Sequence, residues 1–181
     1  SLSFYLPQEI PKAEEQAVLA HFFSLDKELR SEILSTVYRM GSNPKTLLTF
    51  TDSKRISPGE LRKLMIALAM SNPLKVLILD EPTNHLDAVS KELIINALKL
   101  FTGIGLIVSH DRAFADSLCT ATFYLYRESA AFADGADSIR GKLYAANVST
   151  ALELWDTERA SCLSEWHKAD AGVSKAKALS D

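Results

Sequence analysis

The chain has 181 residues, 47% of them apolar, and a formal net charge of −3 at pH 7. This size allows one domain or slightly more with a real core, and the lack of a basic surplus argues against binding nucleic acid through charge alone. Two distant cysteines favour a reducing, cytosolic compartment, and the apolar runs are too short to predict insertion into a membrane.

The first segment predicts a strand followed by a helical region. Residues 3–6 form a short apolar strand that stops at Pro7. Residues 12–40 carry apolar side chains at three- and four-residue steps, which predicts helix. Gly41 ends this region, and a connector over 47–56 follows. Because the chain opens without methionine inside a predicted strand, we expect it to be a piece of a longer protein.

A helix over 58–71 has a clear start. Ser57 suits the N-cap, Pro58 suits the first helical position, and Glu60 stands where a capping box places a carboxylate. An exposed helix start also attracts anions, because its N–H groups and dipole point outward. A well-capped helix without a ligand is the alternative.

The middle of the chain predicts buried parallel strands. Residues 75–79 and 106–108 are continuous apolar runs, typical of strands covered on both faces, and a helix over 88–101 lies between them. The remaining predicted elements are a helix at 112–118, a strand at 122–126 and a hairpin at 134–142. Thr150 and Glu153 predict a capping box at the start of a last helix, whose tail is expected to fray after Trp166. This order indicates an α/β fold with a parallel core sheet and an inserted helical lobe.

Polar residues follow both buried strands, at the edge where parallel sheets gather active groups. Asp80 could orient Mg²⁺ and Glu81 could polarise a water against a phosphate, although the pair could also cap a helix at a strand-to-helix turn. His110 could contact a γ-phosphate or be a histidine bonded to backbone. Gln8, after the turn proline Pro7, could sense a metal or water.

Four segments in order resemble the motifs of ATP-binding-cassette (ABC) ATPases. Lys75-Val-Leu-Ile-Leu-Asp-Glu-Pro-Thr-Asn-His-Leu-Asp87 resembles the Walker B segment and D-loop, in the wording of the ABC-F branch. Ser57-Pro-Gly-Glu-Leu-Arg-Lys63 resembles the signature loop, Val108-Ser-His-Asp-Arg-Ala-Phe114 the switch-histidine region, and Tyr5-Leu-Pro-Gln-Glu9 the Q-loop. A weaker likeness runs to about residue 150.

The resemblance implies ATP and Mg²⁺ as cofactors and a role for each motif. Asp80 would orient Mg²⁺ through water, Glu81 would position the attacking water, and His110 would contact the γ-phosphate. Gln8 would couple metal and water to the helical lobe. Two further sets of residues would face a partner domain: Asp87 would reach across the interface, and the signature residues Ser57, Gly59 and Glu60 would meet the partner's ATP.

Two departures from the family pattern matter. No Gly-x-x-x-x-Gly-Lys-[Ser/Thr] loop occurs in the sequence, so we expect this chain alone to bind ATP weakly or not at all. Pro58 stands where the family has glycine, which removes one N–H donor and would reshape phosphate capping.

The resemblance also sets expectations for organisation and partners. Residues 1–148 would be a partial ABC ATPase domain with its helical subdomain at about 11–72. Residues 149–181 would be a C-terminal extension or the start of an interdomain linker. The expected function is ATP hydrolysis in an ABC-F-type protein with a second ABC domain, acting on the ribosome in translation or antibiotic resistance. The ATPase subunit of a membrane transporter, with a permease partner, and a non-catalytic remnant are the alternatives.

Overall fold

The computed structural model describes residues 2–48, 56–128 and 138–178. The chain divides into two compact units, Ser1–Leu118 and Cys119–Asp181. The predicted domain boundary near residue 148 concerns the family domain and stays a prediction.

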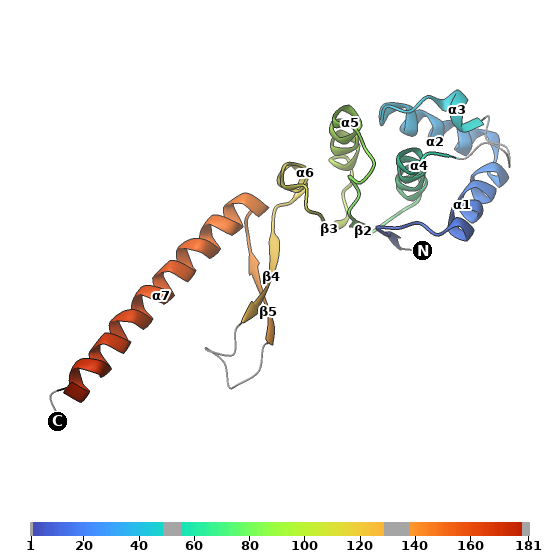
Figure 1. The fold of residues 1–181 in the computed structure, drawn as a ribbon. Helices are drawn as coiled ribbons and strands as arrows, with labels where there is room; N and C mark the ends of the chain where they lie inside the picture. Colours follow the sequence, from blue (N-terminus) through green and yellow to red (C-terminus); the bar gives the residue numbers. More distant parts are fainter. Residues whose placement is uncertain (1, 49–55, 129–137, 179–181) are drawn as a thin grey trace. The chain divides into compact units, whose positions relative to one another are not determined.

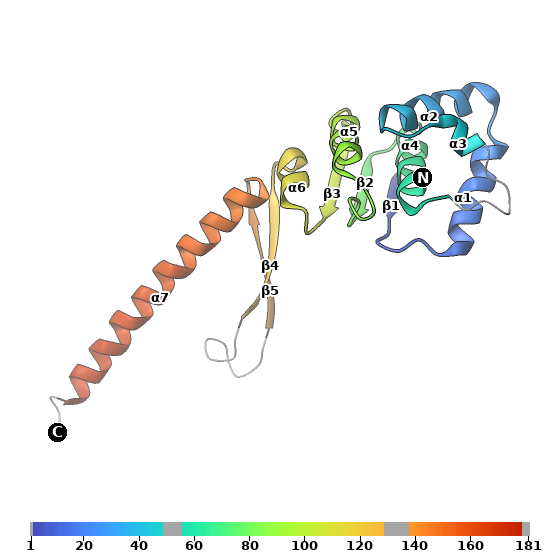
Figure 2. The same cartoon turned by 45° about the horizontal axis from the view of Figure 1, so that its top comes forward.

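The first unit contains a three-stranded parallel sheet in the order β1-β2-β3. Its strands are β1 (Ser3–Leu6), β2 (Val76–Asp80) and β3 (Ile104–Val108). Figure 2 shows them side by side, with α4 (Pro58–Met70) next to β1. In the register, Leu6 lies opposite Leu79, and Asp80 lies opposite Val108. The predicted α/β class and parallel core are therefore confirmed.

The predicted helical region 12–40 is two helices, α1 (Lys12–Ser24) and α2 (Lys27–Arg39). Asp26 interrupts it because its carboxylate accepts a hydrogen bond from Leu29 N–H at 2.8 Å and caps the second helix. A short helix α3 (Pro44–Leu48) occupies the start of the predicted connector. The rest of that connector, 49–55, lies outside the described residues. Helices α1 to α4 gather on one side of this unit (Figure 1).

Helix α4 supplies the centre of the core. Ten of its residues, from Gly59 to Ala69, are buried, and they contact side chains from the sheet and from the other helices. The fully buried large side chains of this unit include Phe22, Ile33, Leu64, Ile66, Leu79, Ile94 and Phe114. Helix α4 thus joins the sheet to the helical lobe.

The prediction of burial on both faces fails for β3. Ile104, Leu106 and Val108 are 71%, 53% and 53% exposed. Apolar composition shows that a strand can be buried, but what covers it depends on its neighbours. Among the described residues, only β2 pairs with β3. The strand also begins earlier than predicted, so Gly105 lies inside it, and α5 (Ala88–Leu98) ends three residues earlier than predicted.

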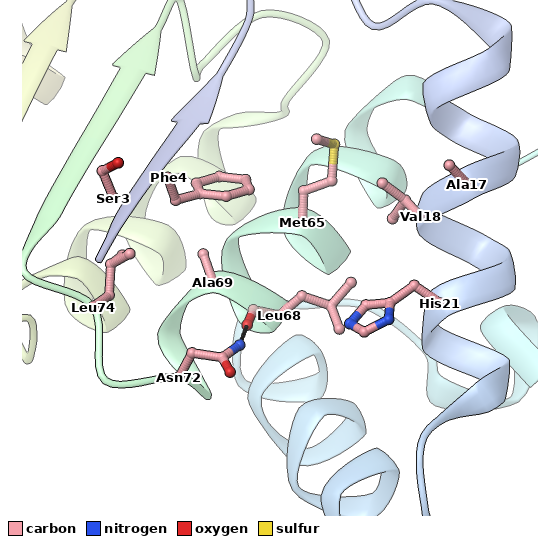
Figure 3. A pocket seen from close by; sticks show the side chains of 10 residues that line it. All are labelled: Ser3, Phe4, Ala17, Val18, His21, Met65, Leu68, Ala69, Asn72 and Leu74. Carbon is pink, nitrogen blue, oxygen red and sulfur yellow. Dashed lines mark hydrogen bonds between the residues drawn. The ribbon is translucent and has the colours of Figure 1, made fainter. Parts of the chain in front are cut away.

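An apolar hollow of about 380 Å³ lies between α1, α4 and β1 (Figure 3). Phe4, Val18, Met65 and Leu68 line it, and Asn72 at its rim donates its amide to the carbonyl of Leu68 at 2.9 Å. None of the predicted site residues lines this hollow, so the candidate site lies elsewhere.

The second unit is an antiparallel hairpin with a long helix. Strand β4 (Thr122–Glu128) pairs with β5 (Ser138–Tyr144), and α7 (Val148–Ala178) follows. Tyr124 and Tyr126 pack on Trp155 with ring centroids 5.1 and 4.3 Å apart. Residues 138–142 of the predicted hairpin belong to the single strand β5, which forms its hairpin with β4. Residues 134–137 lie outside the described residues. The helix α6 (Arg112–Leu118), which closes the first unit, agrees with its prediction.

The start and end of α7 differ from the prediction. Its N-cap is Asn147, whose side-chain oxygen accepts from Thr150 N–H at 3.0 Å, so Thr150 lies inside the helix. The tail after Trp166 does not fray, because the helix continues to Ala178. The tail contains no proline, and the single Gly172 costs only about 1 kcal/mol relative to alanine, which a helix tolerates.

Replacing Asn147 with Ala is expected to cost about 1 kcal/mol of unfolding free energy, because a helix N–H loses its acceptor. Replacing Thr150 with Ala, the cap predicted from sequence, is expected to change stability by less than about 0.5 kcal/mol. Urea unfolding followed by the fluorescence of Trp155 and Trp166 measures both. Equal losses in the two variants would contradict the assignment of the cap.

Candidate active site at the strand ends

The ends of β2 and β3 meet as the sequence predicted. The backbone N–H of Glu81 donates to the carbonyl of Val108 at 2.8 Å, which ties the turn after β2 to the end of β3. The residues that follow each strand, Asp80-Glu81 and Ser109-His110-Asp111, therefore come to one edge of the sheet.

Glu81 is a buried carboxylate with hydrogen-bond partners at this edge. It is 7% exposed, and its Oε1 accepts from the backbone N–H of His110 at 2.9 Å while Ser109 Oγ lies 3.5 Å from Oε2. The His110 Nε2 atom is 3.6 Å from Oε1, and the imidazole is otherwise fully exposed. The structure thus brings Glu81 and His110 together. The imidazole ring of His110 is open to solvent and lies beside the Glu81 carboxylate, which a backbone N–H holds in place.

The backbone of Glu81 is in the left-handed region, with φ of 47°, and His85 in the same loop has φ of 66°. For residues other than glycine this conformation costs on the order of 1–3 kcal/mol and occurs often at functional sites. With this backbone, the Glu81 carboxylate meets the loop after β3, where it accepts from His110 N–H.

Asp80 has a different neighbour, Tyr5. The Tyr5 hydroxyl donates to Asp80 Oδ2 at 3.2 Å. Desolvation and then this hydrogen bond raise the pKa of Tyr5 above its usual value. No described contact joins Asp80 to Glu81 or His110 directly. Sequence reasoning gave Tyr5 no role, because the β1–β2 register, with Tyr5 opposite Ile78, exists only in the folded sheet.

The predicted start of α4 is confirmed in part. Ser57 Oγ accepts from Glu60 N–H at 3.2 Å, and Pro58 is the first helical residue. The reciprocal half of the capping box is wrong, since the Glu60 carboxylate pairs with Lys63 Nζ at 3.1 Å. The buried ammonium of Lys63 competes for that carboxylate.

Gly59 approaches its own domain's loop closely. A Cβ at this position would lie 2.8 Å from the carbonyl oxygen of His85 and 3.3 Å from Leu86 Cδ2. Glycine is therefore required for the α4 start to pack on the 81–87 loop. This contact is independent of any approach to a ligand.

Asp87 caps helix α5. Its Oδ1 accepts from Ser90 N–H at 2.7 Å, and this hydrogen bond lowers the pKa of Asp87 below its usual value. The residue is exposed, so capping leaves its outer surface open. Contact with a partner domain stays a prediction.

The side chain of Gln8 is exposed, and its backbone carbonyl accepts a hydrogen bond from the guanidinium of Arg62. Burial lowers the pKa of Arg62, and the charge of Asp80 opposes this effect. Sequence reasoning missed Arg62. The sequence shows a cation among the apolar residues of α4. A charged residue in a helix is usually expected to face solvent, so its burial was not predicted.

Asp111 is bound by an ammonium and by a helix start. Lys91 Nζ lies 2.7 Å from Asp111 Oδ2, and Phe114 N–H donates to Oδ1 at 3.1 Å. The Lys91 bond, then the backbone bond, lowers the pKa of Asp111. This links α5, which begins after the 81–87 loop, to the residues beside His110.

Lys91→Met is expected to lower the melting temperature at neutral pH. The pKa of Asp111 is lower in the folded chain than in the unfolded chain. Its pairing therefore stabilises the folded state at pH values above the unfolded pKa of about 3.9, and this contribution is lost as the pH falls through the folded pKa. The difference between wild type and variant should therefore shrink below about pH 4. Thermal unfolding across pH 3–7 measures it, with the exposed Lys99→Met as control. A difference constant over that range would contradict the pairing.

Asp80 and the neighbouring Glu81–His110 pair could accommodate Mg²⁺ and a terminal phosphate. Mg²⁺ keeps several waters and takes one or two carboxylates, which suits Asp80 at the strand end beside the Glu81–His110 pair. Among the residues the structure covers, no group of three or more His, Cys, Asp or Glu side chains forms an all-protein metal site. The described helices also include none that could cross a bilayer.

Comparison with known proteins agrees with the motifs. The family model described as ABC transporter matches residues 5–84. The ATP-binding protein Uup of Buchnera aphidicola subsp. Schizaphis graminum is 36% identical over 130 residues, which is 68% of this chain and 22% of that protein. The erythromycin resistance ATP-binding protein MsrA of Staphylococcus epidermidis is 35% identical over 105 residues, 58% of this chain and 21% of that protein.

Two further comparisons extend the picture. The ribosome protection protein VmlR of Bacillus subtilis is 42% identical over 74 residues, 41% of this chain and 14% of that protein. The solved dimeric structure of MJ0796, a bacterial ABC transporter cassette, matches with a TM-score of 0.48 at 19% identity, over 66% of this chain and 53% of that one. The chain spans about a fifth of the length of the curated relatives Uup and MsrA. From the sequence matches and the order of the motifs, the chain carries part of an ABC ATPase domain, and the relatives that it matches are ABC-F proteins.

Proposed function

We propose that this chain supplies the water-activating half of an ATP hydrolysis site in an ABC-F protein that acts on the ribosome. Members of the ABC ATPase family bind ATP with Mg²⁺ and hydrolyse it. The observation that supports the proposal is the buried Glu81 carboxylate, which is held by His110 N–H at 2.9 Å at the ends of two adjacent parallel strands.

The proposed chemistry divides among the strand-end residues. When bound, Mg-ATP supplies the terminal phosphate that water attacks. Glu81 orients this water and accepts its proton, and the exposed ring of His110 donates to a phosphate oxygen. Asp80, whose carboxylate accepts from Tyr5, would hold Mg²⁺ through water, and Gln8, two residues after β1, would respond to the metal and its water.

A partner domain completes the proposed site. Ser57, Gly59 and Glu60 at the start of α4 meet the ATP of a second ABC domain, in the same chain or in a dimer, and Asp87 reaches across the interface. Pro58 leaves one fewer N–H donor at this helix start, so phosphate capping relies on the remaining N–H groups and on the Ser57 hydroxyl.

The ribosome is the proposed site of action because of two relatives, one described as a ribosome protection protein and one as an elongation factor. MsrA, an erythromycin resistance protein, suggests antibiotic resistance as one outcome. We also propose a cytosolic location, consistent with two cysteines far apart in sequence.

The test uses the intact protein. Purified protein should hydrolyse ATP, and ribosomes should co-sediment with it in ATP and raise its turnover. Turnover that responds only to a co-purifying membrane permease would support a transporter subunit instead, and absence of turnover would support the non-catalytic remnant.

The chain itself is proposed to bind Mg-ATP only weakly, because its sequence has no Gly-x-x-x-x-Gly-Lys-[Ser/Thr] loop to cradle the phosphates. Calorimetric titration with Mg-ATP should give a Kd well above the micromolar range. A sub-micromolar Kd would contradict this part of the proposal.

A further inference from the structure

Arg62 is a buried cation that reaches out of its own helix. It lies on α4 with 2% of its surface exposed. Its Nη1 donates to the carbonyl of Pro7 at 3.3 Å, and its Nη2 donates to the carbonyl of Gln8. A buried charge is costly unless its donors are paired. Here the acceptors are two successive backbone carbonyls at the end of β1, more than fifty residues away in sequence.

The neighbouring residue shows that this reach is specific to Arg62. Lys63 is also buried, at 4% exposed, but its ammonium binds Glu60 three residues earlier on the same helix. Of two adjacent buried cations, one stabilises its own helix and the other holds a different element. The planar fork of arginine can serve two acceptors at once, whereas the ammonium of lysine is a single point donor group.

The two ends of this link carry candidate site residues. Ser57, the N-cap of α4, lies five residues before Arg62. The Gln8 carbonyl that Arg62 binds belongs to the residue proposed to sense metal and water. Asp80 adds attraction, since its negative charge acts on the Arg62 guanidinium. A displacement of the α4 start therefore pulls directly on the Gln8 backbone.

We propose that Arg62 is a positioning residue that fixes the Pro7–Gln8 backbone to helix α4. The inference deepens the proposed function, on which it rests: the helix start that meets the partner's ATP and the amide that senses the domain's own metal move as one unit. Binding of the partner's ATP at the start of α4 would thereby change the position of Gln8 in the same domain.

The first test measures backbone order in this chain by ¹⁵N relaxation. In wild type, the amides of Gln8 and Glu9 should have order parameters near those of a rigid backbone, about 0.85, and Arg62→Met should lower them below about 0.6. Lys63→Met is the matched control, with these order parameters unchanged. If Arg62→Met does not fold, Arg62→Lys, which keeps the charge but not the fork, should give an intermediate value. Unchanged order in the folded variants would overturn the proposal.

The second test is a double-mutant cycle on ATP turnover in the intact protein. Arg62→Met and Gln8→Ala should each lower kcat. The double variant should deviate by at least about fivefold from the product of the two effects, because Arg62 is proposed to act by positioning the Gln8 side chain, which Gln8→Ala removes while the backbone carbonyl stays. Independent effects would overturn the coupling. If the intact protein does not hydrolyse ATP, the proposed function fails, and the relaxation experiment still decides the role of Arg62.

Discussion

Glu81→Gln in the intact protein is expected to lower the rate of ATP hydrolysis by about 10²–10⁴-fold, the range that a positioned general base contributes. Glutamine has nearly the same size, and its carbonyl oxygen can still accept from His110 N–H, so the loop after β3 should keep its geometry. The amide cannot take a proton from water. ATP should therefore remain bound without being hydrolysed.

The measurement combines single-turnover hydrolysis with retention of labelled ATP on the protein. Glu92→Gln is the matched control, because Glu92 is an exposed carboxylate on α5 and its loss should leave both quantities unchanged. Wild-type turnover in Glu81→Gln would remove this residue from its proposed role. Loss of ATP binding together with turnover would show that the carboxylate acts through structure.

Gly59→Ala is expected to reduce both stability and partner association. The added methyl would lie 2.8 Å from the backbone oxygen of His85, which cannot move without its strained loop. Overpacking of this kind costs about 1–3 kcal/mol, more than the gain in helix propensity of at most about 1 kcal/mol. Displacing the α4 start should also weaken ATP-dependent association with a partner domain by about tenfold or more, equivalent to 1.4 kcal/mol.

The chain offers a glycine control for this experiment. A Cβ on Gly105 in β3 would meet nothing within 4 Å, so Gly105→Ala should be neutral or stabilising by up to about 1 kcal/mol. Urea unfolding of this chain and sedimentation of the intact protein in ATP measure the two effects. A Gly59→Ala variant as stable and as well associated as Gly105→Ala would contradict the close contact.

Local patterns accounted for much of the site. The apolar run before Asp80 predicts a strand, a polar pair after it predicts a sheet edge, and Ser57-Pro58 predicts a helix start. Each depends on a few consecutive residues whose propensities agree. The hydrogen bond between Glu81 and the loop of His110 followed from two strands of one parallel sheet, since adjacent strands bring their carboxyl ends together.

Where a prediction failed, a competing partner decided the outcome. Glu60 pairs with Lys63 in place of the backbone, and Asn147 caps α7 three residues before the predicted cap at Thr150. Both alternatives are local, but sequence alone does not rank one acceptor above another, because the ranking depends on which side chain is buried and which faces water.

The sequence by itself determined the family, the order of the motifs and the residues proposed to handle water, metal and phosphate, because these depend on residue identity and short spacing. Only the tertiary structure decided that Arg62 binds the carbonyls of Pro7 and Gln8, that Gly59 packs on His85, and that β3 leaves apolar side chains exposed. Such contacts join residues distant along the chain. Whether they form depends on how helices and strands pack, a property of the whole unit that no local pattern records.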